Sequence, residues 1–571
     1  MKKNLILGAA ISAALLAGNA QAITVDANNF PVFDSSAAGD TRVVYLSGAS
    51  AAGTFIEKVL TGAGVAADQI CDVSKPIWKF KDNIDGKTQK AYLCTQSTTA
   101  TGLTLATGKD NLLIYKRDEG GSGYGVSPII AEANGDTAGA TIEFLKVNST
   151  NCTGVAPAAA GTLTNIVCAY TTGNGGNNEM AIPDVGVSDV DPAQFQQANA
   201  PLKTDNVTVF ANVTTADVAK LTVTPGAAVV FGVPVTMHLY RALQGAQLAM
   251  KTIPATGRNN EGTTDVTCVV GDVTNQVCMP SLSKQEIASL IKGDWTNWNK
   301  LMVTIPGVAT PVGLAAWATA NQAADAPASA VAHICRRENG SGTQAQLNNF
   351  ALNYPCTAAS SVTFPAIGND GLNGNKGTKT ESSLVALIHE NSTSDRVTAC
   401  LKDLNLGADT ASDGFTNPYT SGTAPKTFRW AIGAQALEKK DANFEFVKIN
   451  GVAPTLANVV KGDYLDWFEN TFQYNTTHAR FSEAGLKTTI DAIIKAATVP
   501  AVMGSINAGS GLSHGFGNGA YLANPKANTP VITGIFNASL PVNPYSHTPS
   551  SGVALDNCRA PVTYNKSVAG L

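Results

Sequence analysis

The segment His333–Thr343 carries the clearest candidate chemistry in the sequence. It ends in Arg337-Glu-Asn-Gly-Ser-Gly-Thr, and residues 344–352 follow with helical spacing of apolar side chains and no helix breaker. The pattern predicts a strand, a glycine-flanked turn and a helix N-terminus, which presents free backbone N–H groups and the positive end of the helix dipole. Ser341 and Thr343 add hydroxyl donors and Arg337 adds a two-pronged guanidinium, so the segment is a candidate anion site. The alternative is an ordinary helix start with Ser341 as its N-cap.

Residues 41–60 repeat this pattern near the beginning of the chain. They read as a strand, a Gly/Ser turn and an amphipathic helix. Ser50 and the backbone of Ala51 and Ala52 can therefore face an anion at the helix start. The alternative is a common α/β turn whose small residues only allow close packing.

Two further turns add a hydroxyl and a carboxylate. Residues 111–126 run from a strand, past Arg117, into a glycine-rich turn with Ser122 at its centre. Arg117 either assists an anion or pairs with the acidic residues that follow it. Residues 182–192 contain a short strand that ends at Asp189. Asp189 either caps a helix or accepts the proton of a protonated oxyanion and repels a fully ionised one.

Residues 1–22 have the organisation of a cleavable secretory signal, with two lysines, an apolar run and an Ala-Gln-Ala site. No cysteine stands at the cleavage point, so a lipid anchor is not indicated. No later segment has the ~20 unbroken apolar residues of a membrane span. We therefore expect a mature chain that begins near Ile23 and is periplasmic or secreted.

The ten cysteines favour disulfides, because an even number in an exported protein is typical of disulfide pairing. A metal site is not indicated, since the cysteines form no C-x-x-C motif and the histidines are scattered. Pairing of sequence neighbours predicts Cys71–Cys94, Cys152–Cys168, Cys268–Cys278 and Cys335–Cys356, which leaves Cys400 with Cys558.

The composition limits the classes of partner. Charged residues make up 14% of the chain and the formal net charge is −4. Such a surface argues against nucleic acid or an anionic membrane as partner, so an anion must be bound by a local site. The 571 residues exceed one ordinary core, and strands alternate with helices. This predicts two or more α/β lobes with ligands at the carboxyl ends of strands.

The order of these motifs resembles the phosphate-binding proteins of ABC transporters, within the type II periplasmic binding protein superfamily. The resemblance implies a two-lobed α/β fold, no catalytic activity and no cofactor. It also implies an oxyanion between the lobes, with phosphate the leading candidate, and an ABC transporter permease as a further partner. The matching segments cover most of residues 40–475 and occur in the same order: 48–51, 121–125, 186–189, 290–298, 337–343 and 448–455.

The resemblance also implies which groups contact the ligand. They are the turn Ser50, Ala51 and Ala52, the Ser122 hydroxyl, the Asp189 carboxylate, the Arg337 guanidinium, and a cradle of Ser341, Gly342 and Thr343. Asn339, which can donate as well as accept a hydrogen bond, is also predicted to bind the ligand. Asn339 and Ala52 depart from the family, which has an aspartate and a threonine at these positions. The family's aspartate accepts a proton from phosphate, so selectivity here would rest on Asp189, with Glu338 or Glu119 as possible substitutes. Sulfate, arsenate and organic phosphates stay open as ligands.

The predicted division assigns residues 23–230 and 430–500 to lobe I and residues 231–429 to lobe II. Residues 501–571 are predicted to be an irregular C-terminal extension. Two other functions stay open. Low charge, Thr/Asn/Gly-rich insertions and the long tail also fit an extracellular structural or assembly protein that reuses this scaffold. A secreted hydrolase is disfavoured, because the tempting Ser513-His514 pair lies in the tail and not at a strand-to-helix turn.

Overall fold

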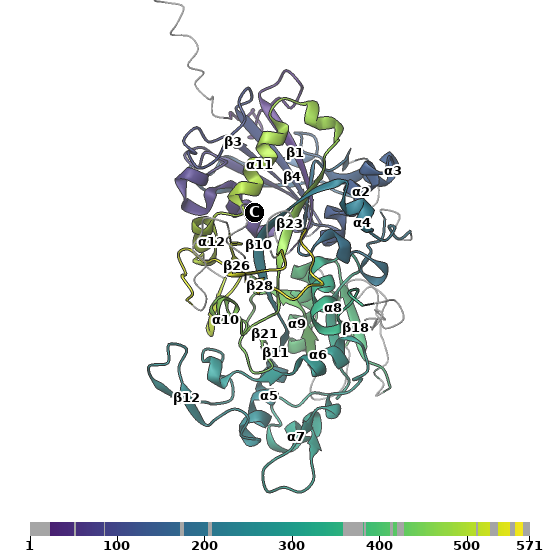
Figure 1. Cartoon of the computed structure of the whole chain (residues 1–571), viewed down its shortest axis with the longest axis vertical. Helices are drawn as coiled ribbons and strands as arrows, with labels where there is room; N and C mark the ends of the chain where they lie inside the picture. Colours follow the sequence, from purple (N-terminus) through teal and green to yellow (C-terminus); the bar gives the residue numbers. More distant parts are fainter. Residues whose placement is uncertain are drawn as a thin grey trace, which may run out of the picture.

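The computed structural model describes residues 23–50, 53–84, 86–171, 176, 178–203, 208–357, 381, 384–410, 415–419, 427–509, 512–525, 535–548 and 554–563. The predicted signal at residues 1–22, and also Ala51 and Ala52, lie outside the described residues. The chain forms a mixed α/β structure of two lobes, each built on its own sheet (Figure 1). We name them the large lobe and the small lobe after these sheets.

The large sheet places three candidate turns side by side. β1 pairs in parallel with both β4 and β9, so the carboxyl ends of these three strands meet at one edge. The hairpin β2–β3, closed by Cys71–Cys94, adds to this sheet beside β4. In spatial order the strands are β20 (Gln435–Ala436), β10 (Leu221–Gly232), β23 (Trp467–Asn475), β9 (Val185–Ser188), β1 (Thr41–Gly48), β4 (Asn111–Arg117), β3 (Gln89–Thr95), β2 (Ile77–Asp82), β7 (Leu163–Cys168) and β6 (Cys152–Thr153), with β26 (Tyr521–Leu522) beside β10.

The central strands of the large sheet are buried on both faces. Leu112 and Ile114 of β4 belong to the hydrophobic core on one face, and Leu113 and Tyr115 belong to the core on the other. Side chains alternate between the faces of a strand, so covering both faces requires a continuous apolar run. Such a sheet has a fixed register, because a slip by one residue exchanges the two cores.

The small sheet carries the strand that ends at the candidate residue Arg337. β17 pairs in parallel with β18 and β19, and its last residue is Arg337. The helix α9 packs on β17, β19 and β11. In spatial order the strands are β18 (Leu387–Asn391), β17 (His333–Arg337), β19 (Ala431–Gly433), β11 (Pro234–Thr236) and β21 (Phe444–Phe446).

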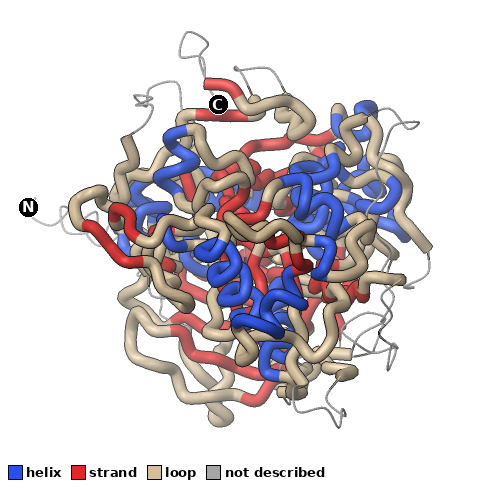
Figure 2. Tube along the Cα trace, turned by 90° about the horizontal axis from the view of Figure 1, so that it is seen from below, coloured by secondary structure: helices blue, strands red, loops and turns tan. Residues whose placement is uncertain are grey.

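Helices lie around both sheets; seen from below, strands run through the interior and helices and loops surround them (Figure 2). Among the described residues, no single helix is long and apolar enough to cross a bilayer; α11 and α12 pass that test only as a pair, and they are bent by 61°. The large lobe carries α1 (Gly53–Leu60), α2 (Ser127–Ala133), α3 (Thr137–Ala140), α4 (Thr215–Val218), α11 (Leu486–Ala496) and α12 (Pro500–Asn507). The small lobe carries α5 (Met237–Ala249), α6 (Lys284–Ile291), α7 (Leu314–Asn321), α8 (Gly342–Leu352), α9 (Ser394–Leu406) and α10 (Leu456–Lys461).

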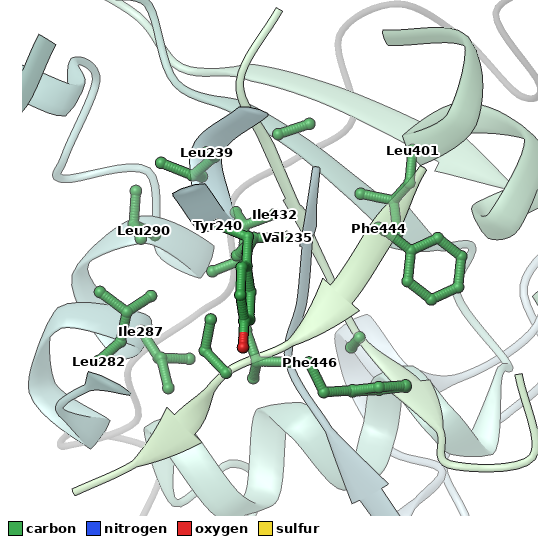
Figure 3. Packing of buried hydrophobic residues seen from close by; sticks show 14 of the residues in the cluster. Val235, Leu239, Tyr240, Leu282, Ile287, Leu290, Leu401, Ile432, Phe444 and Phe446 are labelled. Atoms are coloured by element: carbon green, nitrogen blue, oxygen red, sulfur yellow. The ribbon is translucent and has the colours of Figure 1, made fainter. Parts of the chain in front are cut away.

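The small lobe has one continuous core between its sheet and its helices. Leu239 and Tyr240 of α5 and Leu290 of α6 meet Val235 and Phe446 of the sheet (Figure 3). The buried Tyr240 ring keeps its hydroxyl hydrogen-bonded to the Asp272 carbonyl at 3.2 Å, as a buried phenol requires.

The chain passes between the lobes more than once. It leaves β10 at Gly232 and enters β11 at Pro234, and it leaves β19 at Gly433 and enters β20 at Gln435. Residues 430–500, which the sequence analysis assigned to one lobe, contain strands of both sheets, because β21 pairs with β11 and β23 pairs with β9. The C-terminal extension is not wholly irregular, since it forms most of α12 and the strand β26 in the large sheet.

All ten cysteines are paired. The predicted disulfides Cys71–Cys94, Cys152–Cys168 and Cys268–Cys278 are present. The predicted pairs Cys335–Cys356 and Cys400–Cys558 are wrong, because the structure has Cys335–Cys400 and Cys356–Cys558. Cys356 follows the C-terminal end of α8, where the C-terminal extension brings Cys558 to it. Cys335 on β17 instead meets Cys400 on α9, which packs against that strand.

A buried histidine ties the end of β23 to the beginning of β9. His478 is 5% exposed and lies between two carboxylates. Its Nδ1 is 2.7 Å from Glu132 Oε1 and its Nε2 is 2.8 Å from Asp184 Oδ1. Burial works against protonation, but hydrogen bonds and charge from Asp184 and Glu132 prevail and raise the pKa of His478 to about 9.

We expect this histidine to make stability pH-dependent. The folded-state pKa of about 9 lies above the ordinary value of 6.5, so the stabilisation is complete below pH 6.5 and is lost as the pH rises through about 9. In urea titrations over this range, the free energy of unfolding should fall roughly 1–2 kcal/mol further in the wild type than in His478→Gln, after allowance for solvent screening. Parallel curves for the two proteins would contradict the assignment.

Candidate functional site

Turns from both sheets meet at the junction between the lobes. The large lobe contributes Ser50 after β1, Ser122 in the short 3-10 helix η3 (Gly121–Gly125) after β4, and Asp189 after β9. The small lobe contributes the turn from β17 into α8 and the turn from β18 into α9. Each turn follows the carboxyl end of a strand, which is where open α/β sheets place ligand groups.

Arg337 lies at the centre of this junction and is 1% exposed. Its Nη1 donates to Ser50 Oγ of the large lobe at 2.8 Å and to Ser394 Oγ at 3.2 Å. Its Nη2 donates to the Ser392 carbonyl at 2.8 Å and its Nε to the Asn391 carbonyl at 3.1 Å. Burial lowers the pKa of the guanidinium and neighbouring carboxylates oppose the shift, but an arginine stays charged in either case.

Asp189 faces the same junction and is equally buried. Its backbone N–H donates to Ser122 Oγ at 3.0 Å, and Thr343 Oγ1 donates to Asp189 Oδ2 at 3.3 Å. The second carboxyl oxygen, Oδ1, is buried and has no hydrogen-bond partner among the described residues. Burial raises the pKa of Asp189 to about 6, although Arg337 acts to lower it.

The two lobes touch through glycines at this point. The Gly123 N–H donates to the Gly340 carbonyl at 2.6 Å. Gly342 packs so closely on the large lobe that a Cβ there would lie 2.2 Å from Ser122 Oγ and 2.8 Å from Asp189 Cβ. Only a residue without a side chain permits this approach.

The helices α8 and α9 begin at the junction. Ser341 is the N-cap of α8, where its Oγ accepts from the Gln344 N–H at 3.3 Å, so the N-cap interpretation of Ser341 is confirmed. The N–H groups of Gly342 and Thr343 lie in the first turn, where the helix itself offers no acceptor. Thr393 caps α9 in the same way. The positive ends of both helix dipoles therefore favour negative charge at the junction.

The structure does not bring every predicted residue to this cluster. Asn339 is exposed and its side-chain oxygen accepts from Arg336 Nη2 at 3.0 Å. Arg117 points away, where its Nη1 donates to the Glu143 carbonyl at 2.8 Å. Ala51 and Ala52 lie outside the described residues. The junction set is therefore Ser50, Ser122, Asp189, Arg337, Ser341, Gly342 and Thr343, which we call the junction cluster.

Sequence reasoning missed two contributions to the cluster. Lys116, the neighbour of Arg117 in β4, is fully buried and donates to the Gly48 carbonyl at 2.6 Å. Neighbouring side chains of a strand point to opposite faces of the sheet, so only one of Lys116 and Arg117 can face the cluster. The sequence alone does not indicate which of the two it is. Ser392 and Ser394 follow the buried strand β18, and Ser394 is the first residue of α9. This is the same strand–turn–helix signal that identified the other turns.

The described residues contain neither the Ser513–His514 catalytic pair that the sequence suggested nor a metal-binding group. The Ser513 hydroxyl is exposed and contacts Asn518 Oδ1 at 3.2 Å, whereas the buried His514 Nε2 is 2.8 Å from the Leu437 carbonyl. These neighbours on β24 (Ser513–His514) therefore do not form a nucleophile–base pair. In the part of the chain that the structure describes, no group of three or more His, Cys, Asp or Glu side chains can hold a metal ion.

No protein-family model and no curated protein matches the sequence. Among solved structures, the chain is similar to a protein described as a phosphate ABC transporter substrate-binding protein with bound phosphate from Clostridium perfringens, at 11% identity and a TM-score of 0.32, over 79% of this chain and 93% of that one. It is also similar to an ABC-type phosphate transport receptor from Vibrio cholerae, at 13% identity and a TM-score of 0.25, over 55% and 73%. PstS from Borrelia burgdorferi matches at 10% identity and a TM-score of 0.21, over 58% and 81%. Likeness at this level carries no argument about the ligand.

The close approach at Gly342 gives a direct test of the junction. We expect Gly342→Ala to force the lobes apart, because the new methyl group would overlap Ser122 and Asp189, and to lower the free energy of unfolding by about 1–3 kcal/mol. Amide hydrogen exchange at Gly123, whose N–H crosses between the lobes, should become faster. Gly176→Ala, where a Cβ meets nothing within 4 Å, is the control. Unchanged exchange in Gly342→Ala would show that the contact is not needed for closure.

Proposed function

We propose that the protein binds an oxyanion, most favourably phosphate, between its two lobes and performs no catalysis on it. The observation that carries this proposal is two buried charged groups at the junction: the Arg337 guanidinium, and the Asp189 carboxylate, whose Oδ1 has no hydrogen-bond partner among the described residues. A buried carboxylate oxygen without a partner is costly. A hydroxyl of a protonated oxyanion is a donor that can satisfy it.

The remaining cluster groups are suited to the other oxygens of such a ligand. Ser50 and Ser394 accept from Arg337, which leaves each hydroxyl hydrogen to donate to an anion. The first N–H groups of α8 and the positive helix ends add donors without adding net charge. Each hydrogen bond to a charged ligand contributes about 1.5–3 kcal/mol, so this local set suffices in a protein whose formal net charge is −4.

Phosphate is favoured over sulfate by Asp189. An ionised Asp189 accepts a hydrogen bond from the hydroxyl of a protonated oxyanion, but it repels an oxyanion that is fully ionised. Asn339 plays no part in this choice, because it is exposed and bonded to Arg336. The sequence resemblance supports export across a membrane and transfer of the ligand to an ABC transporter permease as further parts of the proposal.

One observation favours a second candidate, a structural or assembly protein of the cell surface. The hydrogen bonds of Arg337 at the junction go to protein oxygens from both lobes, so the cation also serves to join the lobes. In that case neither phosphate nor sulfate would give a signal in calorimetry of the oxidised protein, and assembly would be indifferent to both.

Arg337→Gln is the sharpest test of the anion site. We expect the affinity for phosphate in calorimetry at neutral pH to fall at least roughly 100-fold, because charge-assisted hydrogen bonds are lost. Arg42→Gln is the matched control: Arg42 is also fully buried in the large lobe, at the start of β1, and donates to the Thr107 carbonyl at 3.0 Å. Ser122→Ala serves as a milder variant that removes one hydroxyl. Undiminished binding in Arg337→Gln would overturn the site.

Asp189 predicts a pH-dependent choice of anion. Its pKa is about 6, so sulfate should be rejected at neutral pH and should begin to bind as the pH falls through about 6, when the protonated carboxyl can donate to it. Asp189→Asn should bind sulfate at neutral pH and lose this pH dependence, whereas Asn339→Asp should behave as the wild type. Equal sulfate binding by the wild type and Asp189→Asn across this range would refute the role of Asp189.

A further inference from the structure

Residues 554–563 cross from one lobe to the other beside the junction cluster. Asn557 is 2% exposed and forms a reciprocal pair with Asp191 of the large lobe. The Asp191 N–H donates to Asn557 Oδ1 at 2.7 Å, and the Asn557 N–H donates to Asp191 Oδ2 at 2.8 Å. In Figure 1 the end of this segment, β28 (Val562–Thr563), lies between the large lobe and the small lobe.

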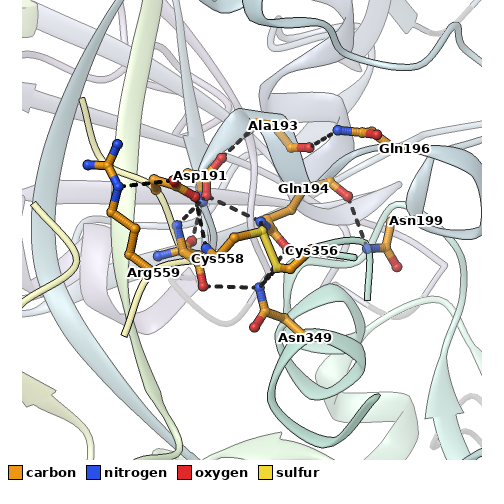
Figure 4. The surroundings of a disulfide bond; sticks show 11 residues. Asp191, Ala193, Gln194, Gln196, Asn199, Asn349, Cys356, Cys558 and Arg559 are labelled. Carbon is orange, nitrogen blue, oxygen red and sulfur yellow. Dashed lines mark hydrogen bonds and ion pairs between the residues drawn. A yellow bond between two sulfur atoms is a disulfide. The ribbon is translucent and has the colours of Figure 1, made fainter. Parts of the chain in front are cut away.

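The same segment is fastened to the small lobe by a covalent bond. Cys558 forms a disulfide with Cys356, which follows α8 (Figure 4). Asn349 of α8 donates from Nδ2 to the Asn557 carbonyl at 3.1 Å and to Gln194 Oε1 of the large lobe at 3.0 Å. Asn557 is therefore hydrogen-bonded to both lobes, and its neighbour Cys558 is bonded covalently to the small lobe.

The two attachment points belong to elements that build the junction cluster. Asp191 stands two residues after Asp189, and α8 begins with Gly342 and Thr343. To separate these elements, the protein must break the Asp191–Asn557 pair, because the disulfide does not open. The buried Asp191 carboxylate would then lose the Asn557 N–H, and the Asp191 N–H would lose its acceptor, which opposes separation. The tether also keeps Asn557 at a high local concentration next to Asp191, so a broken pair forms again quickly.

We propose that residues 554–563 are an interlobe strap that keeps the lobes closed over the junction cluster and limits the rate at which an anion enters and leaves. The part of this proposal that concerns anion exchange rests on the proposed function. The closure itself does not, because the strap joins the lobes whether or not an anion is bound. Residues 554–563 thus hold the two lobes together in addition to the chain crossings at residues 232–234 and 433–435.

Two double variants, each with the two cysteines of one disulfide replaced by serine, test the strap. Cys356→Ser/Cys558→Ser removes its covalent bond to the small lobe, and Cys268→Ser/Cys278→Ser removes a disulfide that lies within the small lobe. Without any anion, amide hydrogen exchange at Gly123 and Gly340 reports closure, since these N–H groups donate to Gly340 and Asn199 across the junction. We expect exchange there at least roughly ten-fold faster in the first variant and unchanged in the control.

The release of labelled phosphate is the second readout. It should accelerate by a similar factor in Cys356→Ser/Cys558→Ser and in Asn557→Ala, which keeps the disulfide but removes the acceptor of the Asp191 N–H. Asn557→Ala also covers the case in which the double variant fails to fold. Equal amide exchange in the wild type and in Asn557→Ala would overturn the strap. If no protein binds phosphate, the proposed function fails, and amide exchange still decides whether the strap closes the lobes.

Discussion

The solvation of one buried cation governs the arrangement of the two lobes. Arg337 is removed from water, and such a charge is tolerated only where protein oxygens replace the lost hydration. Those oxygens come from Ser50 in one lobe and from residues 391–394 in the other. The lobes must therefore lie in one relative position for the guanidinium to be satisfied, and the glycines at the contact remove the side chains that would prevent that position.

Under the proposed function, the same cluster would account for anion binding by a protein with negative net charge, because attraction and selection would both be local. The positive potential is local, because it arises from the buried Arg337 guanidinium and from helix N-termini. Asp189 limits that potential to ligands that can donate a proton. Attraction and selection are thus produced by groups a few ångströms apart, with no contribution required from the outer surface.

Much of the site could be predicted because its signals are local. Ser122 and Asp189 come after strands and Arg337 ends a strand, each at a predicted turn, and those signals can be read without tertiary structure. What failed depended on details that these local patterns do not contain. Choosing Lys116 over Arg117 requires knowing which face of β4 lies toward the site, and excluding Asn339 requires its side-chain hydrogen bond to Arg336. Pairing Cys356 with Cys558 requires the path of the distant C-terminal extension. The hairpin β2–β3 extends the main sheet beside β4, because an isolated hairpin leaves its edges unpaired.

The place of β23 in the large sheet has a consequence for how the chain is made. This strand, residues 467–475, lies between β9 and β10, so those two earlier strands never pair with each other. Until β23 is available, a growing chain has two open strand edges at the centre of its largest sheet. Such edges are prone to pair with other chains, and contacts this distant in sequence form slowly. The large lobe is therefore completed only after nearly the whole polypeptide has been synthesised, and the partial chain must be kept from aggregating until then.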